Sequence, residues 1–212
     1  MKKLLKIIPI LLLTTLFLQS CDNDDDTVIP PVTNNIVDIA QSSEDFTSLV
    51  AALQKANLVT TLQTQGPFTV LAPTNAAFST FLLDNGFGSL DEVPVDVLTN
   101  ILLNHVVGGR LASTDLTTGY ASTFATSSAS DASMSIFIDT SNGVRFNGVS
   151  SVTTADISAD NGIVHVVDAV IGLPTIATFA TSNNALSILV DALVYADSGS
   201  PTVPYISTVS DA

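Results

Sequence analysis

Apolar residues with helical spacing mark the start of the ordered part of the chain. Phe46, Leu49, Val50 and Leu53 lie at positions i, i+3, i+4 and i+7, which places them on one face of an amphipathic helix. Two serines at positions 42 and 43, followed by acidic residues, supply candidate N-terminal caps. The pattern therefore predicts a helix that packs against a core through this face.

A second helix is predicted from about Val95 to His105. Val97, Ile101 and His105 recur at intervals of four residues and so share one face, with two leucines beside them. His105 therefore ends an apolar helical face, where burial is expected.

Short apolar runs bounded by turn residues predict β-strands, mostly later in the chain. Pro73 closes the first run, and Thr74 can cap a helix that begins near Asn75. Asn142 and Gly143 separate the second run from the third, and this pair is a strong hairpin signal. Because helices come first and strands later, the sequence predicts an α+β domain. The four runs are residues 68–72, 134–138, 144–146 and 163–167.

Three of these segments resemble the homology boxes of fasciclin domains. Residues 68–78 (FTVLAPTNAAF) look like the first box, and residues 161–168 (NGIVHVVD) look like the second. Between them, residues 101–107 (ILLNHVV) are similar to the family's central segment, which usually has Tyr-His where this chain has Asn-His. The order and spacing of all three match the family, and the resemblance covers about residues 34–174.

The resemblance implies an α+β module with a β-sandwich-like wedge and a helical cap. Fasciclin modules serve adhesion and matrix contact outside cells, so the resemblance implies no catalytic residue. Asn104 replaces the family's usual tyrosine, while His105 keeps the neighbouring histidine. Asp156 and Ile157 match the Asp-Ile pair that animal members present to cell-surface receptors. The alternative for this pair is a strand end, with Ile157 inward and Asp156 in a turn.

An internal repeat follows this region. Seven residues between Ile36 and Leu53 recur at a constant offset of 140 positions, between Ile176 and Leu193. We therefore interpret residues 175–212 as the start of a second, incomplete fasciclin-like repeat.

The N-terminus is predicted to direct export and to anchor the protein. Lys2 and Lys3 precede an apolar run, so residues 1–20 are interpreted as a signal peptide. The run ends in LQSC, which resembles the lipobox of bacterial lipoproteins, and Cys21 is the only cysteine in the chain. A lipid on Cys21 would hold the protein on a membrane. The alternative is a buried or leftover thiol.

Residues 21–33 are predicted to form an acidic tether. The run DNDDD after Cys21 resembles an export signal that sends lipoproteins to the cell exterior in some Gram-negative groups. We therefore expect an outer-membrane location that faces the exterior. A solvated, self-repelling spacer is the alternative interpretation.

The net negative charge of the chain argues against nucleic acids as partners. After residue 20 the chain has three basic residues against 20 acidic ones, a net charge of −17. Proteins bind nucleic acids largely through Lys and Arg side chains that displace the counterions of the phosphate backbone. Three basic residues are too few for this, which argues against nucleic-acid binding. The membrane, through the lipid on Cys21, and a surface polymer or protein ligand remain as expected partners.

His105 and His165 are the only histidines, and we interpret both as structural. His165 alternates with apolar residues in a run that is typical of a buried strand, so a hydrogen-bonded core residue is favoured over a metal ligand or a catalytic base. No nucleophile elbow, phosphate loop or zinc spacing occurs in the chain. We therefore expect no catalytic residue, no metal and no cofactor.

Two functions of different classes remain. One is adhesion or matrix interaction, and the other is an accessory glycan-binding lipoprotein of a polysaccharide uptake system. Sugar rings stack on exposed Trp or Tyr, but Trp is absent and Tyr120 is the only tyrosine in residues 34–174. Adhesion is therefore favoured.

Overall fold

The computed structural model describes residues 34–64, 66–127 and 130–198. The predicted signal peptide, Cys21 and the acidic tether lie outside the described residues, so these assignments stay predictions. The helical elements are α1 (Ile36–Ser42), η1 (Glu44–Phe46), α2 (Thr47–Lys55), α3 (Val59–Gln63), α4 (Asn75–Asp84), η2 (Leu90–Glu92), α5 (Val95–Asn104), α6 (Ile176–Ser182), η3 (Asn184–Leu186) and α7 (Ser187–Ser198), where η marks a 3-10 helix. The strands are β1 (Phe68–Pro73), β2 (Val106–Gly108), β3 (Gly119–Thr126), β4 (Ser133–Asp139), β5 (Arg145–Phe146), β6 (Ser150–Ala159) and β7 (Gly162–Val167).

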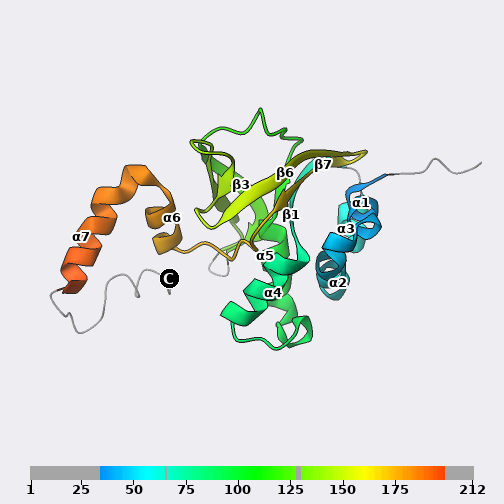
Figure 1. Ribbon diagram of the computed structural model, residues 1–212, viewed down its shortest axis with the longest axis horizontal. Helices are drawn as coiled ribbons and strands as arrows, with labels where there is room; N and C mark the ends of the chain where they lie inside the picture. Colours follow the sequence, from blue (N-terminus) through cyan, green and yellow to red (C-terminus); the bar gives the residue numbers. More distant parts are fainter. Residues whose placement is uncertain (1–33, 65, 128–129, 199–212) are drawn as a thin grey trace, which may run out of the picture. The chain divides into compact units, whose positions relative to one another are not determined.

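The seven strands of the described residues follow one another in chain order and close into a barrel. Neighbouring strands are antiparallel, except that β1 pairs with β7 in parallel, from Phe68 opposite Gly162 to Pro73 opposite Val167 (Figure 1). This last pairing joins the two ends of the sheet. The mixed α+β class is confirmed, whereas the β-sandwich description is not, because closure leaves one continuous barrel instead of two stacked sheets.

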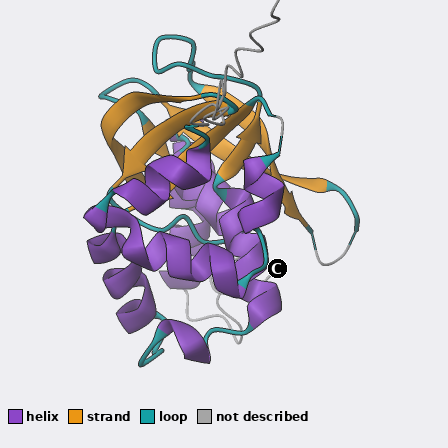
Figure 2. Ribbon diagram, turned by 90° about the vertical axis from the view of Figure 1, so that its right-hand side faces the viewer, coloured by secondary structure: helices purple, strands orange, loops and turns teal. Residues whose placement is uncertain are grey.

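β1 and β7 are buried on both faces, which explains why their apolar residues run on without alternation. On one face, Val70 and Val164 belong to a core beneath the helices. On the other face, Leu71 and Val167 belong to a second core with Ile136 and other residues of the barrel strands. The helices lie outside the strands (Figure 2), so the two strands separate one apolar layer from the other.

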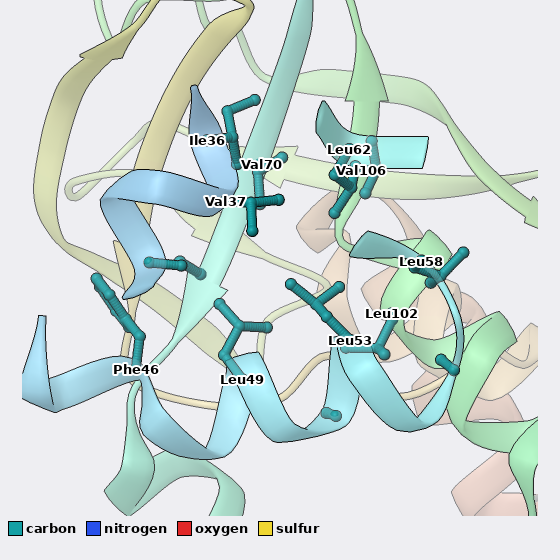
Figure 3. Packing of buried hydrophobic residues seen from close by; sticks show 14 of the residues in the cluster. Ile36, Val37, Phe46, Leu49, Leu53, Leu58, Leu62, Val70, Leu102 and Val106 are labelled. Carbon is teal, nitrogen blue, oxygen red and sulfur yellow. The ribbon is translucent and has the colours of Figure 1, made fainter. Parts of the chain in front are cut away.

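The core beneath the helices receives the helical faces that the sequence predicts. Phe46, Leu49 and Leu53 each keep only 4% of their surface exposed and belong to the same core as Val70 (Figure 3). In α5, Ile101 is buried as predicted, but Val97 is 44% exposed. The prediction that Val97 shares the buried face is therefore wrong, and the leucines of α5 fill that part of the core instead.

The predicted caps and turn are present with one difference. The Thr74 side chain accepts a hydrogen bond from Ala77 N at the start of α4, as predicted. Gly143 adopts a φ of +78° in the loop that joins β4 to β5, which the Asn-Gly signal predicts. Ser43 caps η1 instead of α2, because the short helix α1 precedes it and extends to residue 42.

Across the described residues, no helix combines the length and the apolar character that crossing a membrane requires.

Candidate binding surface

Asp156 lies within β6 at a break in the strand's register. The pairing of β6 with β7 shifts between Thr154 and Ile157, and Asp156 at this bulge has a φ of +65°. Asp tolerates this left-handed conformation better than most residues. The bulge re-aims the side chain, and Asp156 is exposed. The residue therefore lies inside a strand and not in the turn that the alternative interpretation predicted.

A single residue of the loop between β2 and β3 holds the Asp156 carboxylate. Ser113 donates to it twice, through its backbone N–H at 2.8 Å and through its hydroxyl. The Ser113 hydroxyl, and after it the Ser113 N–H, lower the pKa of the Asp156 carboxyl below its usual value. The exposed carboxylate is thus ionised at neutral pH and fixed in one orientation.

Ile157 is placed differently from its neighbour. Its side chain is partly buried and packs against the core beneath the helices. The structure therefore does not display Asp156 and Ile157 together, and Ile157 points inward as the alternative interpretation expected.

His165 lies directly beneath this surface, in β7, with no exposed area. Its Nε2 lies 2.9 Å from the carbonyl oxygen of Leu111, which can only accept, so Nε2 donates. Its Nδ1 then accepts from the backbone N–H of Asp156 at 3.2 Å. The neutral ring satisfies both partners, and it connects the loop after β2 to the bulge in β6.

Arg110, which is exposed, also fixes the loop between β2 and β3. Its Nη1 donates to the carbonyl oxygens of Ala159 at 3.0 Å and Gly162 at 2.7 Å, and its Nη2 donates to the hydroxyl of Ser158 at 2.9 Å. The sequence analysis counted Arg110 only among the three basic residues after residue 20, and it missed Ser113 and Ser158. We name the set Arg110, Ser113, Asp156 and Ser158 the Asp156 surface.

The geometry of these side chains does not suit nucleophilic catalysis. A Ser-His-Asp site needs the serine hydroxyl on a histidine nitrogen, and the histidine in turn on the carboxylate. Here the Ser113 hydroxyl donates to Asp156, while both nitrogens of His165 are engaged by backbone groups. In the described ranges, no three His, Cys, Asp or Glu residues gather closely enough to hold a metal ion.

His105 and Asn104 lie elsewhere, at the end of α5. Nδ1 of His105 donates to the carbonyl oxygen of Ile101 at 2.8 Å, and Nε2 accepts from the N–H of Ile171 at 2.9 Å. Burial lowers the pKa of His105 from 6.5 to about 4, against the smaller opposing effect of the bond to Ile101. Asn104 is fully buried and donates to the carbonyl oxygen of Gly172 at 3.0 Å. Both side chains thus bind the segment after β7 and neither reaches the surface.

The chain is similar to a protein family model and to two proteins of Synechocystis sp.. The model of the Fasciclin domain family matches residues 44–174. The uncharacterized protein sll1735 of Synechocystis sp. is 41% identical over 137 residues, which cover 65% of this chain and 96% of that protein. Protein sll1483 of the same organism is 36% identical, over 64% of this chain and 72% of that protein.

Two animal proteins also match. Transforming growth factor-beta-induced protein ig-h3 of Oryctolagus cuniculus is 30% identical over 68% of this chain, which corresponds to 20% of that longer protein. Among solved structures, a FAS1 domain pair from the insect cell adhesion molecule fasciclin I aligns with a TM-score of 0.41 at 23% identity, covering 66% of this chain and 47% of that one.

Proposed function

The chain belongs to the fasciclin domain family, and from this premise we propose that it is a surface-anchored lipoprotein that mediates cell adhesion or contact with an extracellular protein or polymer. The fasciclin domain, residues 34–174, makes the contact. A lipid on Cys21 and the acidic tether of residues 21–33 attach it to the outer membrane, facing the exterior. The domain binds its ligand and does not convert it.

The observation that supports this proposal is the preorganised Asp156 surface. Ser113 fixes the carboxylate, and Arg110 and His165 fix the loop that carries Ser113. A ligand that meets such a surface does not have to order it, so less binding free energy is lost. An exposed carboxylate accepts hydrogen bonds from hydroxyl or N–H groups and pairs with basic side chains. The strong negative charge of the chain steers basic partners toward it.

A surface of a few polar side chains gives weak single contacts, and membrane anchoring compensates for that weakness. Copies that share one membrane engage the same partner surface at a high effective concentration. Attachment of whole cells is therefore a more sensitive measurement than the affinity of one isolated domain.

The first prediction is that Asp156→Asn lowers cell attachment to the partner surface by about tenfold, a loss typical of a residue central to binding. Asn also tolerates the left-handed backbone at this position, so the fold is retained while the charge is removed. The measurement is the number of cells that attach, or aggregate, when they express the full-length variant.

Asp139→Asn is the matched control for this experiment. Asp139 is also a barrel aspartate whose pKa is lowered by hydrogen bonds from a serine, Ser141, but it lies at the end of β4. Its replacement is expected to leave attachment unchanged. Equal attachment by wild type and Asp156→Asn would remove Asp156 from the binding surface.

A polar groove favours the second candidate function, glycan binding for polysaccharide uptake. The groove has a volume of about 600 Å³, and Gln63, Arg110 and Asp160 are among the polar residues that line it. Such groups bind sugar hydroxyls in the absence of aromatic stacking. If cells that lack the protein attach normally but fail to grow on one polysaccharide, glycan binding replaces adhesion.

The second prediction concerns the anchor. Wild-type protein is expected to incorporate radiolabelled palmitate, and Cys21→Ala is expected to incorporate none, because no other cysteine is present. Labelled protein is detected by autoradiography after immunoprecipitation. Equal labelling of the two proteins would contradict lipidation at Cys21.

A further inference from the structure

The first helix after the fasciclin domain packs on the outside of the barrel. The ring of Phe179 in α6 meets the ring of Tyr120 in β3 edge to face, with centroids 5.5 Å apart. Tyr120 in turn contacts Phe137 of β4 at 5.0 Å. Nδ2 of Asn183, just after α6, donates to the Tyr120 hydroxyl at 3.1 Å. One tyrosine of the barrel therefore binds two residues of the following segment.

A second contact lies beside the first, at the turn between β5 and β6. A Cβ added to Gly148 would lie 3.2 Å from Cβ of Ser182 and 3.3 Å from its Cα. A side chain at this position would therefore require the end of α6 to move away by a few tenths of an ångström. Gly148 also has a φ of +69°, which favours glycine at that position for a second reason.

α6 repeats the structure of α1, but not all of its counterpart residues are buried. Both helices have seven residues and begin with a capping box, and a 3-10 turn and a longer helix follow each of them. In the first copy, Ile36 is buried at 3% exposure and Leu49 at 4%. Their counterparts at the offset of 140 residues, Ile176 and Leu189, are exposed at 58% and 47%. The contacts with the barrel come instead from Phe179, Ser182 and Asn183.

We propose that the Tyr120 face of the barrel is a docking surface for the first helix of the following repeat, so that the two repeats are joined rigidly. The joint consists of Tyr120, Phe137 and Gly148 on the barrel and Phe179, Ser182 and Asn183 on the following segment. While α6 docks through these residues, Ile176 at its start stays exposed. A rigid joint would fix the orientation of each repeat relative to the next, and with it the orientation of their binding surfaces.

The joint contributes to the stability of α6 as a helix. Isolated helices shorter than about 12 residues are marginal in water, and α6 has seven. Its own repeat provides little cover, since Ile188 and Tyr195 of α7 are each 81% exposed. The contacts with the barrel therefore control whether the amides of α6 are protected from exchange with solvent.

The third prediction tests the joint by hydrogen–deuterium exchange of the full-length protein. In Phe179→Ala and in Tyr120→Ala, amides of residues 176–183 are expected to exchange at least about tenfold faster than in wild type, because loss of an aromatic pair favours local opening. Amides of β7 are expected to keep their protection in both variants, since Tyr120 lies on the outer surface of the barrel.

Tyr195→Ala is the matched control, because it removes a tyrosine of the same segment that is 81% exposed. Exchange in residues 176–183 should not change in this variant. Tyr120→Phe removes only the bond from Asn183 and should give an intermediate increase. Exchange of residues 176–183 that is unchanged in both alanine variants, or already unprotected in wild type, would overturn the joint.

Discussion

Gly162→Ala is expected to lower the free energy of unfolding by about 4 kcal/mol, near the upper end of single-residue effects. A Cβ at this position would lie 2.2 Å from the carbonyl oxygen of Phe68 and 2.8 Å from Cδ1 of Ile36. The first of these atoms is backbone of the paired strand, so β1 itself has to move away from β7. The parallel pairing that closes the barrel starts at this pair of residues. Urea unfolding followed by circular dichroism measures the loss.

Gly119→Ala provides the matched control for this change. Gly119 also lies at the start of a strand, β3, but nothing lies within 4 Å of an added Cβ. We expect the free energy of unfolding of the Gly119→Ala variant to stay within about 0.5 kcal/mol of that of the wild type. If Gly162→Ala proves as stable as Gly119→Ala, then β1 and β7 adjust to the added methyl group and the close approach is not required.

The positions of β1 and β7 could be predicted from the sequence, but their pairing could not. Burial on both faces produces a continuous apolar run, and such runs are visible in residues 68–72 and 163–167. Nothing in either run indicates that the two strands lie side by side and in parallel. Closure depends on contacts between distant parts of the chain, and the β-sandwich-like description, which rested on the family resemblance, is not confirmed.

β3 and β6 gave no strand signal, for different reasons. In β3 burial alternates, but the buried residues are Thr123 and Ala125, while the aromatic residues Tyr120 and Phe124 are exposed. β6 reads SSVTTADISA, with four exposed residues in a row from 153 to 156. The bulges in its pairing with β7 break the alternation that identifies a half-buried strand. The local pattern therefore identifies strands that bury large apolar residues, and it misses strands whose buried positions are small or polar.

The candidate surface was predictable only in part. Asp156 stood out through the family resemblance, but its partner Ser113 lies 43 residues away and is an ordinary serine in the sequence. Arg110 reaches Gly162 across 52 residues. Such partners become visible only when the loop after β2 lies against the hairpin of β6 and β7. The sequence identifies the residue types, and the fold decides which of them meet.

Acid is expected to destabilise the protein through His105, by about 3 kcal/mol between pH 7 and pH 4. The pKa of His105 is about 4 in the folded protein, against 6.5 for the unfolded side chain. Between these values the unfolded chain binds a proton that the folded protein excludes, so the free energy of unfolding falls as the pH falls. The full contribution is present above pH 6.5 and is lost by about pH 4, and a difference of this size in pKa corresponds to about 3 kcal/mol.

His105→Gln separates this effect from those of the carboxylates. Gln does not titrate, so the variant is expected to be less stable at pH 7, because the bonds to Ile101 and Ile171 are disturbed, yet to lose much less stability than wild type between pH 6.5 and pH 4. Asp139 and Asp156, whose pKa values lie below 3.8, contribute in a separate window at lower pH. Urea unfolding at half-unit steps of pH gives both curves. If the two curves stay parallel from pH 6.5 to pH 4, His105 takes up its proton without unfolding, and its buried ring does not control the acid sensitivity of the fold.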